Sequence, residues 1–292
     1  MSLPPRAVVV HRATELTELV ARHGTRQQAG FFLTSRGRSL EELEQRHDAQ
    51  QAALANVSAA IPLDWRRAVA ERNDLDRFVF GPEDVVIAVG QDGLVANVAK
   101  YLDGQPVVGI NPDPGRNPGV LVRHPPAATA KLLTMQGPSE SRTMVVAQTD
   151  DGQRLLALNE VYVGHRSHQS ARYRLITPDG FEERQSSSGI LTGTGTGSTG
   201  WCRSAWQERK SPLTLPAVTE PALCWFVREA WPSPATGTTC TEGLLKGSQR
   251  LTIVAESDLV VFGDGMESDT LSLGWGEGLD LRTADTRLDL VR

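Results

Sequence analysis

Residues 85–94 read Val-Val-Ile-Ala-Val-Gly-Gln-Asp-Gly-Leu, and this stretch decides the fold of the first part of the chain. The five apolar residues 85–89, mostly β-branched, are typical of a buried strand. A tight turn at 90–93 follows, and residues 94–102 are expected to form a helix. A second apolar run at 107–110 predicts the next strand. Strands that alternate with helices indicate parallel pairing, so we expect an α/β first domain.

The preceding residues continue this alternation. Residues 7–10 are expected to form a buried strand, and residues 14–23 a helix that ends at Gly24. The apolar run Gly30–Leu33 predicts a further strand. Residues 38–60 are rich in Glu, Gln and Ala and predict one long helix.

The pattern changes near His124-Pro125-Pro126, after which short apolar runs alternate with turn residues. The second domain is therefore expected to be mostly β, and a sandwich is the expected architecture. We place the domain boundary after residue 126. The expected strands are 144–147, 155–163, 171–176, 189–192, 251–255, 259–262 and 271–275.

Length and composition restrict the class of protein. The chain has 292 residues, 39% of them hydrophobic and 22% charged, as expected for a globular protein of two domains. A net charge of -5 argues against a general nucleic-acid binder. The three cysteines are odd in number and widely spaced, which argues against a disulfide framework or a zinc site. Without a long apolar run or a presequence pattern, we expect no membrane insertion and a cytoplasmic location.

The first candidate for chemistry is the turn Gly90-Gln91-Asp92-Gly93. It follows a buried strand and precedes a helix, which is where ligands bind in open α/β sheets. The helix N-terminus suits a phosphate group, and the glycines allow a ligand close to the backbone. Asp92 has the chemistry to accept a proton from a hydroxyl group. The alternative is a plain β-to-α turn in which Asp92 only caps the helix.

The second candidate is the run Thr192–Gly200, in which four glycines are interspersed with five hydroxyl residues. Its backbone amides and hydroxyls indicate an anion-binding nest. Without a lysine it is not a Walker A loop, and it does not open the βαβ unit that a dehydrogenase fingerprint requires. The alternative is a flexible loop or a glycine-rich strand edge.

Three further features are weaker. An adjacent amide and carboxylate, Asn159 and Glu160, can divide a ribose diol between them, although solvent exposure alone also explains the pair. Gly263-Asp264-Gly265 by itself predicts a hairpin turn. His165 and His168 lie three residues apart without an identifiable third ligand, so we predict no metal site there.

Taken in order, these segments resemble the NAD kinase family, whose pattern is Gly-Gly-Asp-Gly-Thr, then Asn-Glu, then a Thr/Gly/Ser-rich loop, then a late Asp-Gly. The run 108–114, the segment 157–164 and residues 187–195 resemble the mitochondrial-type branch and its bacterial relatives more closely. The chain departs from the family pattern at Gln91, Leu94 and Trp201. It also carries Ser188 where many members have Asp.

The resemblance implies a Rossmann-like N-terminal domain, a β-sandwich C-terminal domain over 127–270, and a segment 271–292 that returns to the first domain. It implies transfer of the γ-phosphoryl group of ATP to the 2′-hydroxyl of the adenosine ribose of NAD, giving NADP. Asp92 would be the base, and Mg²⁺ would arrive with ATP. The substrate-binding residues would be Gly90, Gln91, Gly93, Asn159, Glu160, Ser188, Thr194, Thr196, Gly197, Ser198, Thr199, Gly200, Trp201 and Asp264.

Members of this family are usually homo-oligomers, so a homodimer or homotetramer is expected, without a nucleic-acid or membrane partner. Two other functions stay open. One is a kinase of the same fold that acts on another nucleoside, sugar or lipid hydroxyl. The other is a catalytically silent NAD-binding sensor, which the departures at Gln91 and Leu94 would suit.

Overall fold

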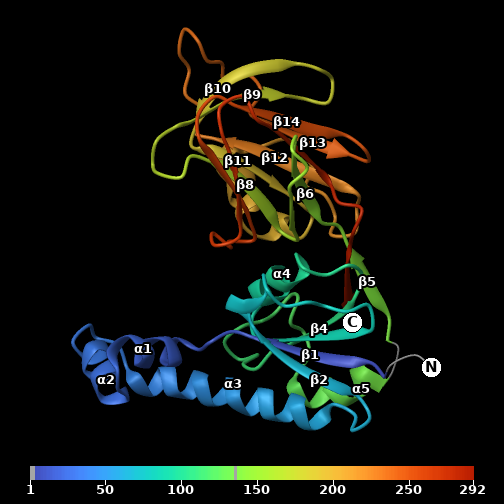
Figure 1. The fold of residues 1–292 in the computed structure, drawn as a ribbon. Coiled ribbons are helices and arrows are strands. Elements are labelled where there is room, and N and C mark those ends of the chain that lie inside the picture. The colour runs from blue at the N-terminus through green and yellow to red at the C-terminus, as the bar shows by residue number, and fades with distance from the viewer. Residues whose placement is uncertain (1–3, 135–136) are drawn as a thin grey trace. The chain divides into compact units, whose positions relative to one another are not determined.

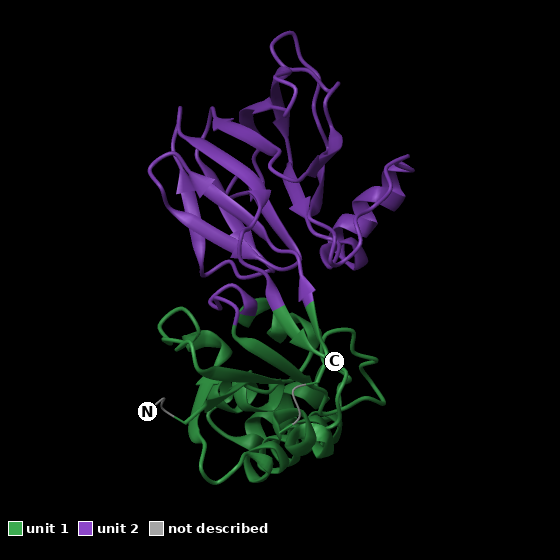
Figure 2. Ribbon diagram, turned by 90° about the vertical axis from the view of Figure 1, so that its right-hand side faces the viewer, with its two compact units in different colours: residues 1–98, 105–140, 289–292 green, residues 99–104, 141–288 purple. Residues whose placement is uncertain are grey.

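The computed structural model describes residues 4–134 and 137–292. By their internal contacts these form two compact units, shown in Figure 2. Unit 1 comprises residues 1–98, 105–140 and 289–292, and unit 2 comprises residues 99–104 and 141–288. The two units are described separately.

Unit 1 is built on a six-stranded sheet with the order β2-β1-β3-β4-β18-β5. Strands β2, β1, β3, β4 and β18 pair in parallel, which confirms the predicted α/β class. The strands are β1 (Arg6–His11), β2 (Arg66–Glu71), β3 (Asp84–Val89), β4 (Pro106–Ile110), β5 (Ser139–Arg142) and β18 (Leu288–Val291).

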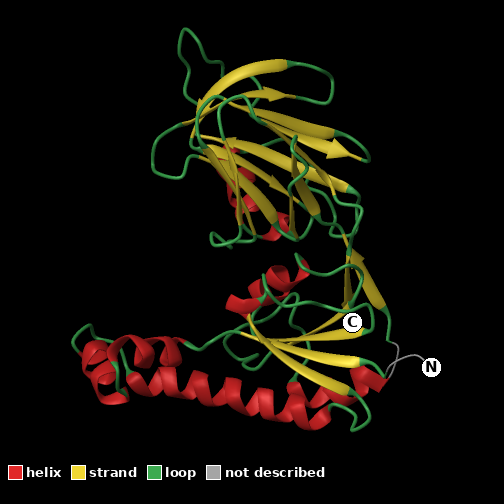
Figure 3. Cartoon of the chain, viewed as in Figure 1, coloured by secondary structure: helices red, strands yellow, loops and turns green. Residues whose placement is uncertain are grey.

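Unit 1 also contains helices, which Figures 1 and 3 show together with the sheet. They are α1 (Glu15–His23), α2 (Arg26–Thr34), α3 (Leu40–Ala60), α4 (Asp92–Ala99) and α5 (Thr129–Thr134), with short 3₁₀ turns at Arg72–Asp74 and Pro126–Ala128. Ala53 and Val57 of the long helix α3, four residues apart, and Ile61 directly after it are buried in a core that includes Val9 and Ile87. The predicted helix over 38–60 is therefore confirmed.

The strand predicted at Gly30–Leu33 was wrong, because these residues lie in helix α2. Thr25 caps this helix by accepting a hydrogen bond from the amide of Gln28 at 3.2 Å. Ala29 and Leu33, four residues apart, are buried against α1 and α3, whereas Phe31 is 79% exposed. This helical spacing of the buried positions outweighs the local run of apolar residues.

Unit 2 is a β-sandwich, as predicted. One sheet has the order β10-β9-β14-β17-β6-β7 and the other the order β13-β12-β11-β8-β15-β16. A single core cluster draws residues from both sheets, among them Val145, Tyr173, Val161 and Trp225. The elements are β6 (Val145–Thr149), β7 (Arg154–Ala157), β8 (Glu160–Gly164), β9 (Ala171–Ile176), β10 (Glu182–Ser187), β11 (Gly189–Gly193), a 3₁₀ turn (Gly197–Thr199), α6 (Trp201–Arg209), β12 (Ala222–Arg228), β13 (Glu242–Lys246), β14 (Arg250–Ala255), β15 (Leu259–Gly263), β16 (Thr270–Leu273) and β17 (Gly278–Thr283).

The single strand predicted over 155–163 is two strands that belong to different sheets. Strand β7 ends at Ala157 in the first sheet, and β8 begins at Glu160 in the second. Leu158 and Asn159 therefore form the corner at which the chain passes from one sheet of the sandwich to the other. This corner positions the Asn159–Glu160 pair.

The units differ in extent from the domains drawn from sequence. Residues 127–140 group with unit 1, and residues 271–288 group with unit 2. The reason for the second difference is that β16 and β17 pair inside the sandwich, whereas β18 pairs with β4 in the sheet of unit 1. Within the described residues, no helix is both long enough and apolar enough to cross a membrane.

Candidate functional site

Asp92 is the first residue of α4, immediately beyond the turn that follows β3. Its Oδ1 atom accepts hydrogen bonds from the amides of Val120, Leu121 and Val122 at 3.0, 2.8 and 3.0 Å. Its Oδ2 atom accepts one from the amide of Val120 at 2.9 Å. Amide hydrogen bonds of this kind stabilise a carboxylate. Because Oδ1 accepts from three amides and Oδ2 from one, Oδ2 has more capacity to accept a further hydrogen bond.

The segment that Asp92 holds passes closely over β4. A Cβ atom on Gly109 of β4 would overlap the carbonyl group of Leu121, so this approach requires glycine. Gly119 has a φ of +65°, which also favours glycine. Asp92 therefore anchors residues 120–122, a role without a sequence signal because its partners are backbone amides.

The other residues of the predicted turn differ in their surroundings. The amide of Gly90 donates to the carbonyl oxygen of Ile110 at 3.0 Å. Gln91 is exposed, and its side-chain amide donates to Asn117 Oδ1 at 3.3 Å. It does not have a positive φ. Gly93 is exposed with open space beside its Cα atom, so the backbone remains approachable there.

In unit 2, Asp264 holds the corner between β7 and β8. Its carboxylate accepts hydrogen bonds from the amides of Leu158 at 2.8 Å, Asn159 at 2.7 Å and Glu160 at 3.4 Å. In return, the amide of Asp264 donates to the carbonyl oxygen of Glu160 at 3.1 Å. Asp264 itself has a φ of +53°, a conformation that Asp and Asn tolerate better than other side chains. The late Asp-Gly and the Asn-Glu pair, about a hundred residues apart, thus form one structure.

Two acidic side chains meet at this corner. Burial raises the pKa of Glu160 to about 8, and repulsion from Asp264 adds to the rise. Burial also raises the pKa of Asp264 to about 6, against the opposing effect of the amides of Leu158 and Asn159 and of the Lys100 charge. Near neutral pH, Glu160 is therefore mostly a neutral acid that can both donate and accept, while Asp264 is mostly ionised.

The Thr/Gly-rich run packs directly against this corner. The Thr194 hydroxyl donates to the carbonyl oxygen of Leu158 at 2.5 Å, and the Thr194 amide donates to the carbonyl oxygen of Asn159 at 2.9 Å. A Cβ atom on Gly197 would overlap the carbonyl group of Asn159. The glycine at 197 therefore lets the loop support the Asn159–Glu160 pair.

Most amides of this loop already have partners inside it. Those of Thr196 and Gly197 donate to the Thr194 hydroxyl at 3.0 and 3.3 Å, and that of Ser198 donates to the Thr194 carbonyl oxygen at 2.9 Å. The amides of Thr199 and Gly200 also donate within the loop. The open nest of free amides that the sequence suggested is therefore not the arrangement in this structure.

Trp201 lies at the exposed end of the loop and is 37% exposed. Its ring stacks on that of Tyr162 at 5.5 Å with an interplanar angle of 16°, and the Arg228 guanidinium lies 5.2 Å from the ring centre of Trp201. The Tyr162 hydroxyl donates to the carbonyl oxygen of Ser188 at 2.6 Å. Ser188 and Trp201 are thus joined through Tyr162, a residue outside the predicted site motifs.

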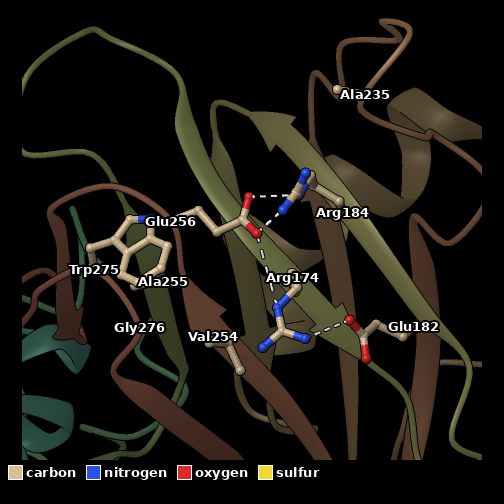
Figure 4. Close-up of a pocket in the computed structure, with 9 residues that line it drawn as sticks. All are labelled: Arg174, Glu182, Arg184, Ala235, Val254, Ala255, Glu256, Trp275 and Gly276. Carbon is tan, nitrogen blue, oxygen red and sulfur yellow. Dashed lines mark hydrogen bonds and ion pairs between the residues drawn. The ribbon is translucent and has the colours of Figure 1, made fainter.

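A hollow on unit 2 is lined by none of the predicted site residues. It has a volume of about 550 Å³ and is lined by Arg174, Glu182, Arg184, Glu256 and Trp275, among others (Figure 4). Arg184 pairs with Glu256 at 2.9 Å and Arg174 with Glu182 at 2.7 Å. Because its charges are compensated, this hollow does not offer a ready phosphate site.

Three comparisons with known proteins bear on this geometry. No family model matches the chain. NAD kinase 2, mitochondrial, from Rattus norvegicus is 29% identical over 252 residues, covering 68% of this chain and 59% of that protein. The protein of the same name from Homo sapiens is 27% identical over 252 residues, covering 68% of this chain and 57% of that protein. The chain thus spans less than two thirds of the curated relatives it matches.

The fold comparison covers nearly the whole chain. An NAD kinase from Archaeoglobus fulgidus, solved in complex with ATP, superposes with a TM-score of 0.57 at 19% identity, over 98% of this chain and 93% of that one. The α/β unit followed by a β-sandwich therefore defines a protein with the NAD kinase fold. The curated relatives confirm, at the level of sequence, the resemblance to NAD kinases that the motifs indicated.

Proposed function

We propose that this chain is an NAD kinase that transfers the γ-phosphoryl group of ATP to the 2′-hydroxyl of the adenosine ribose of NAD, giving NADP. The observation that carries the proposal is the corner at Leu158–Glu160. There an amide and a neutral acid stand side by side, held by Asp264 and backed by the Thr/Gly-rich loop. The similarity to NAD kinases over 252 residues supports it.

In this proposal Asn159 and Glu160 bind the ribose hydroxyls of NAD. Both residues are half-buried, and their backbone amides are fixed by the Asp264 carboxylate. A neutral Glu160 can give one hydrogen bond and accept another, as a ribose hydroxyl pair requires. Leaving such a buried polar group unpaired costs about 1–3 kcal/mol, which makes the pair selective for a diol.

The remaining predicted residues are assigned to the adenine ring and the phosphate groups of the substrates. Trp201 offers an aromatic ring for adenine. Ser188 is connected to it through Tyr162, which stacks on Trp201 and donates a hydrogen bond to the Ser188 carbonyl oxygen. The loop of Thr194, Thr196, Gly197, Ser198, Thr199 and Gly200 shapes the site mainly by supporting the corner. Gly90, Gln91 and Gly93, at the start of α4, are assigned to phosphate.

Asp92 is the proposed general base. Its Oδ2 atom would take the proton of the 2′-hydroxyl while the 2′-oxygen attacks the γ-phosphorus, the bond from that phosphorus to the β–γ bridging oxygen breaks, and ADP leaves. The contacts to Val120–Val122 fix the carboxylate in one orientation, which suits a positioned base.

Mg²⁺ is proposed to arrive with ATP, held by phosphate oxygens and water. The described residues contain no group of three or more His, Cys, Asp or Glu that could hold a metal, so we assign it no protein ligand set. We further propose a cytoplasmic homodimer or homotetramer that does not bind nucleic acid or membranes. The net charge of -5 and the unpaired state of Cys202, Cys224 and Cys240 in the structure support this setting.

One observation favours a second candidate, an NAD-binding protein without kinase activity. Asp92 has a structural task in anchoring residues 120–122, and that task alone would explain its presence.

The decisive experiment incubates the purified chain with NAD, ATP and Mg²⁺ and measures NADP with an NADP-specific dehydrogenase. The proposal expects NADP only when both substrates are present. Tight NAD binding by calorimetry without NADP would favour the second candidate, and phosphorylation of another hydroxyl compound in place of NAD would identify a different acceptor.

A further inference from the structure

A buried lysine stands beside the proposed ribose site, and the sequence motifs do not include it. Lys100 follows directly after α4, in the segment 99–104 that belongs to unit 2. Its side chain is only 2% exposed, and its Nζ atom lies 2.7 Å from Asp269 Oδ2. A buried ammonium group destabilises a fold unless it is paired, so the contact with Asp269 is needed to hold Lys100 in this position.

The partner of Lys100 lies in the turn between β15 and β16, residues 264–269, whose first residue is Asp264. This turn is compact, since the amide of Met266 donates to the carbonyl oxygen of Gly263 at 3.0 Å and that of Asp269 to Met266 at 3.3 Å. The Tyr101 hydroxyl adds a second bond to Asp269 Oδ2 at 2.7 Å. Lys100 and Tyr101 therefore clamp one end of the turn while Asp264 caps the corner at the other.

The charge of Lys100 also acts on Asp264, whose pKa it lowers against the effect of burial. This matters because Asp264 accepts hydrogen bonds through both oxygens, Oδ2 from Leu158 and Oδ1 from Asn159. A protonated carboxyl would present a hydroxyl in place of one acceptor and lose one of these contacts. The ionised form is thus the one that holds the corner in the arrangement seen here.

We infer that Lys100 is a positioning residue for NAD. Its ammonium clamps the 264–269 turn through Asp269, and Asp264 at the start of that turn presents Asn159 and Glu160 to the ribose. This inference rests on the proposed function. Lys100 acts through Asp264 and does not itself touch substrate.

The test compares Lys100→Met, which removes the charge at similar length, with Lys100→Arg, which retains it. Lys246→Met, which removes an exposed lysine from β13 of the same unit, is the matched control. Steady-state kinetics with NAD and ATP are measured from pH 5 to 7.5. This range covers Asp264 and stays below the pKa of about 8 of Glu160; the other groups that face this cluster are Asp269, Tyr101 and Cys224.

We expect Lys100→Met to raise the KM for NAD at pH 7 by roughly tenfold or more, which corresponds to about 1.4 kcal/mol. The kcat and the KM for ATP should change by less than about threefold. The acid limb of kcat/KM for NAD should move to higher pH in Lys100→Met and stay in place in Lys100→Arg and Lys246→Met. An unchanged acid limb, or equal increases in both KM values, would overturn the inference while leaving the kinase proposal intact.

A second measurement does not depend on activity. Urea unfolding at pH 7 compares the wild type, Lys100→Met, Asp264→Asn and the double variant, because Asn fits the positive φ of Asp264 and keeps one acceptor oxygen. If Lys100 supports ionised Asp264, its removal destabilises the wild type more than it destabilises Asp264→Asn. Equal losses in the two backgrounds would refute the link. If the wild type forms no NADP, the proposed function fails, and this cycle alone decides whether Lys100 supports Asp264.

Discussion

Replacing Glu160 with Gln should change how the stability of unit 2 depends on pH. Burial and the Asp264 charge raise the pKa of Glu160 from 4.5 to about 8 in the folded chain. A carboxyl whose folded pKa is raised contributes stability below its unfolded pKa, and that contribution is lost as the pH rises through the folded pKa. The wild type should therefore lose stability between about pH 4.5 and 8.

The expected size follows from the pKa shift. One pKa unit corresponds to about 1.4 kcal/mol, so Glu160 should account for a loss of about 3–5 kcal/mol in the free energy of unfolding across that range. Asp264, with a folded pKa of about 6, acts in the same direction at lower pH. The interval from pH 6.5 to 9 therefore isolates Glu160.

Urea unfolding followed by tryptophan fluorescence is a suitable assay, because five of the six tryptophans lie in unit 2 and only Trp65 lies in unit 1. Glu160→Gln is neutral in both states, so its margin over the wild type should be small below pH 4.5, about 2 kcal/mol near pH 6 and about 3–5 kcal/mol at pH 9. Between pH 6.5 and 9 the wild type should therefore lose about 2 kcal/mol that Glu160→Gln keeps. Glu208→Gln, at an exposed position of α6, controls for the loss of one negative charge. A wild-type curve that stays flat from pH 6.5 to 9, or that runs parallel to Glu160→Gln, would show that Glu160 is not the source of this pH dependence.

Five further substitutions test the site. Asp92→Asn should lower kcat by about 10²–10⁴ with little change in melting temperature, since the remaining carbonyl oxygen can still accept from residues 120–122; wild-type kcat would show that Asp92 is not the base. Asn159→Ala should raise the KM for NAD by about 10- to 100-fold and leave the KM for ATP nearly unchanged, and equal effects on both would indicate a structural role. Gly197→Ala should destabilise the chain by about 1–3 kcal/mol, because its Cβ would overlap Asn159, whereas Gly93→Ala, with open space beside it, should not lower the melting temperature. Gln91→Gly should change kcat/KM by no more than about tenfold, the value of one hydrogen bond, and a complete loss of activity would show that Gln91 does more than make one such contact.

The sequence predicted the parts of this fold that depend on local pattern. The apolar run that became β3 and the Ala- and Glu-rich stretch that became α3 carry their own periodicity. The run Gly30–Leu33 misled the prediction because a short apolar run of four residues fits a strand and a buried helix equally well. Only packing against α1 and α3, which the sequence does not display, decided for the helix.

The same contrast between local pattern and long-range contacts applies to the candidate site. Its residue types and their order were readable, but their connections were not, because they are made across long separations and largely to backbone amides. Asp264 lies 105 residues from Asn159, and Asp92 lies 28 from Val120. The division of 155–163 into two strands depends on this Asp264 contact, which leaves no local signal. Lys100 was missed for a related reason, since a lone lysine at a helix end is usually an exposed residue.

The most direct test of the account is the wild-type reaction with NAD, ATP and Mg²⁺, with the product identified by mass spectrometry and by an NADP-specific dehydrogenase. We expect NADP and ADP to form in equal amounts, with the new phosphate on the 2′-oxygen of the adenosine ribose. The absence of NADP from a folded chain that binds NAD, or a phosphate placed on another acceptor, would contradict it.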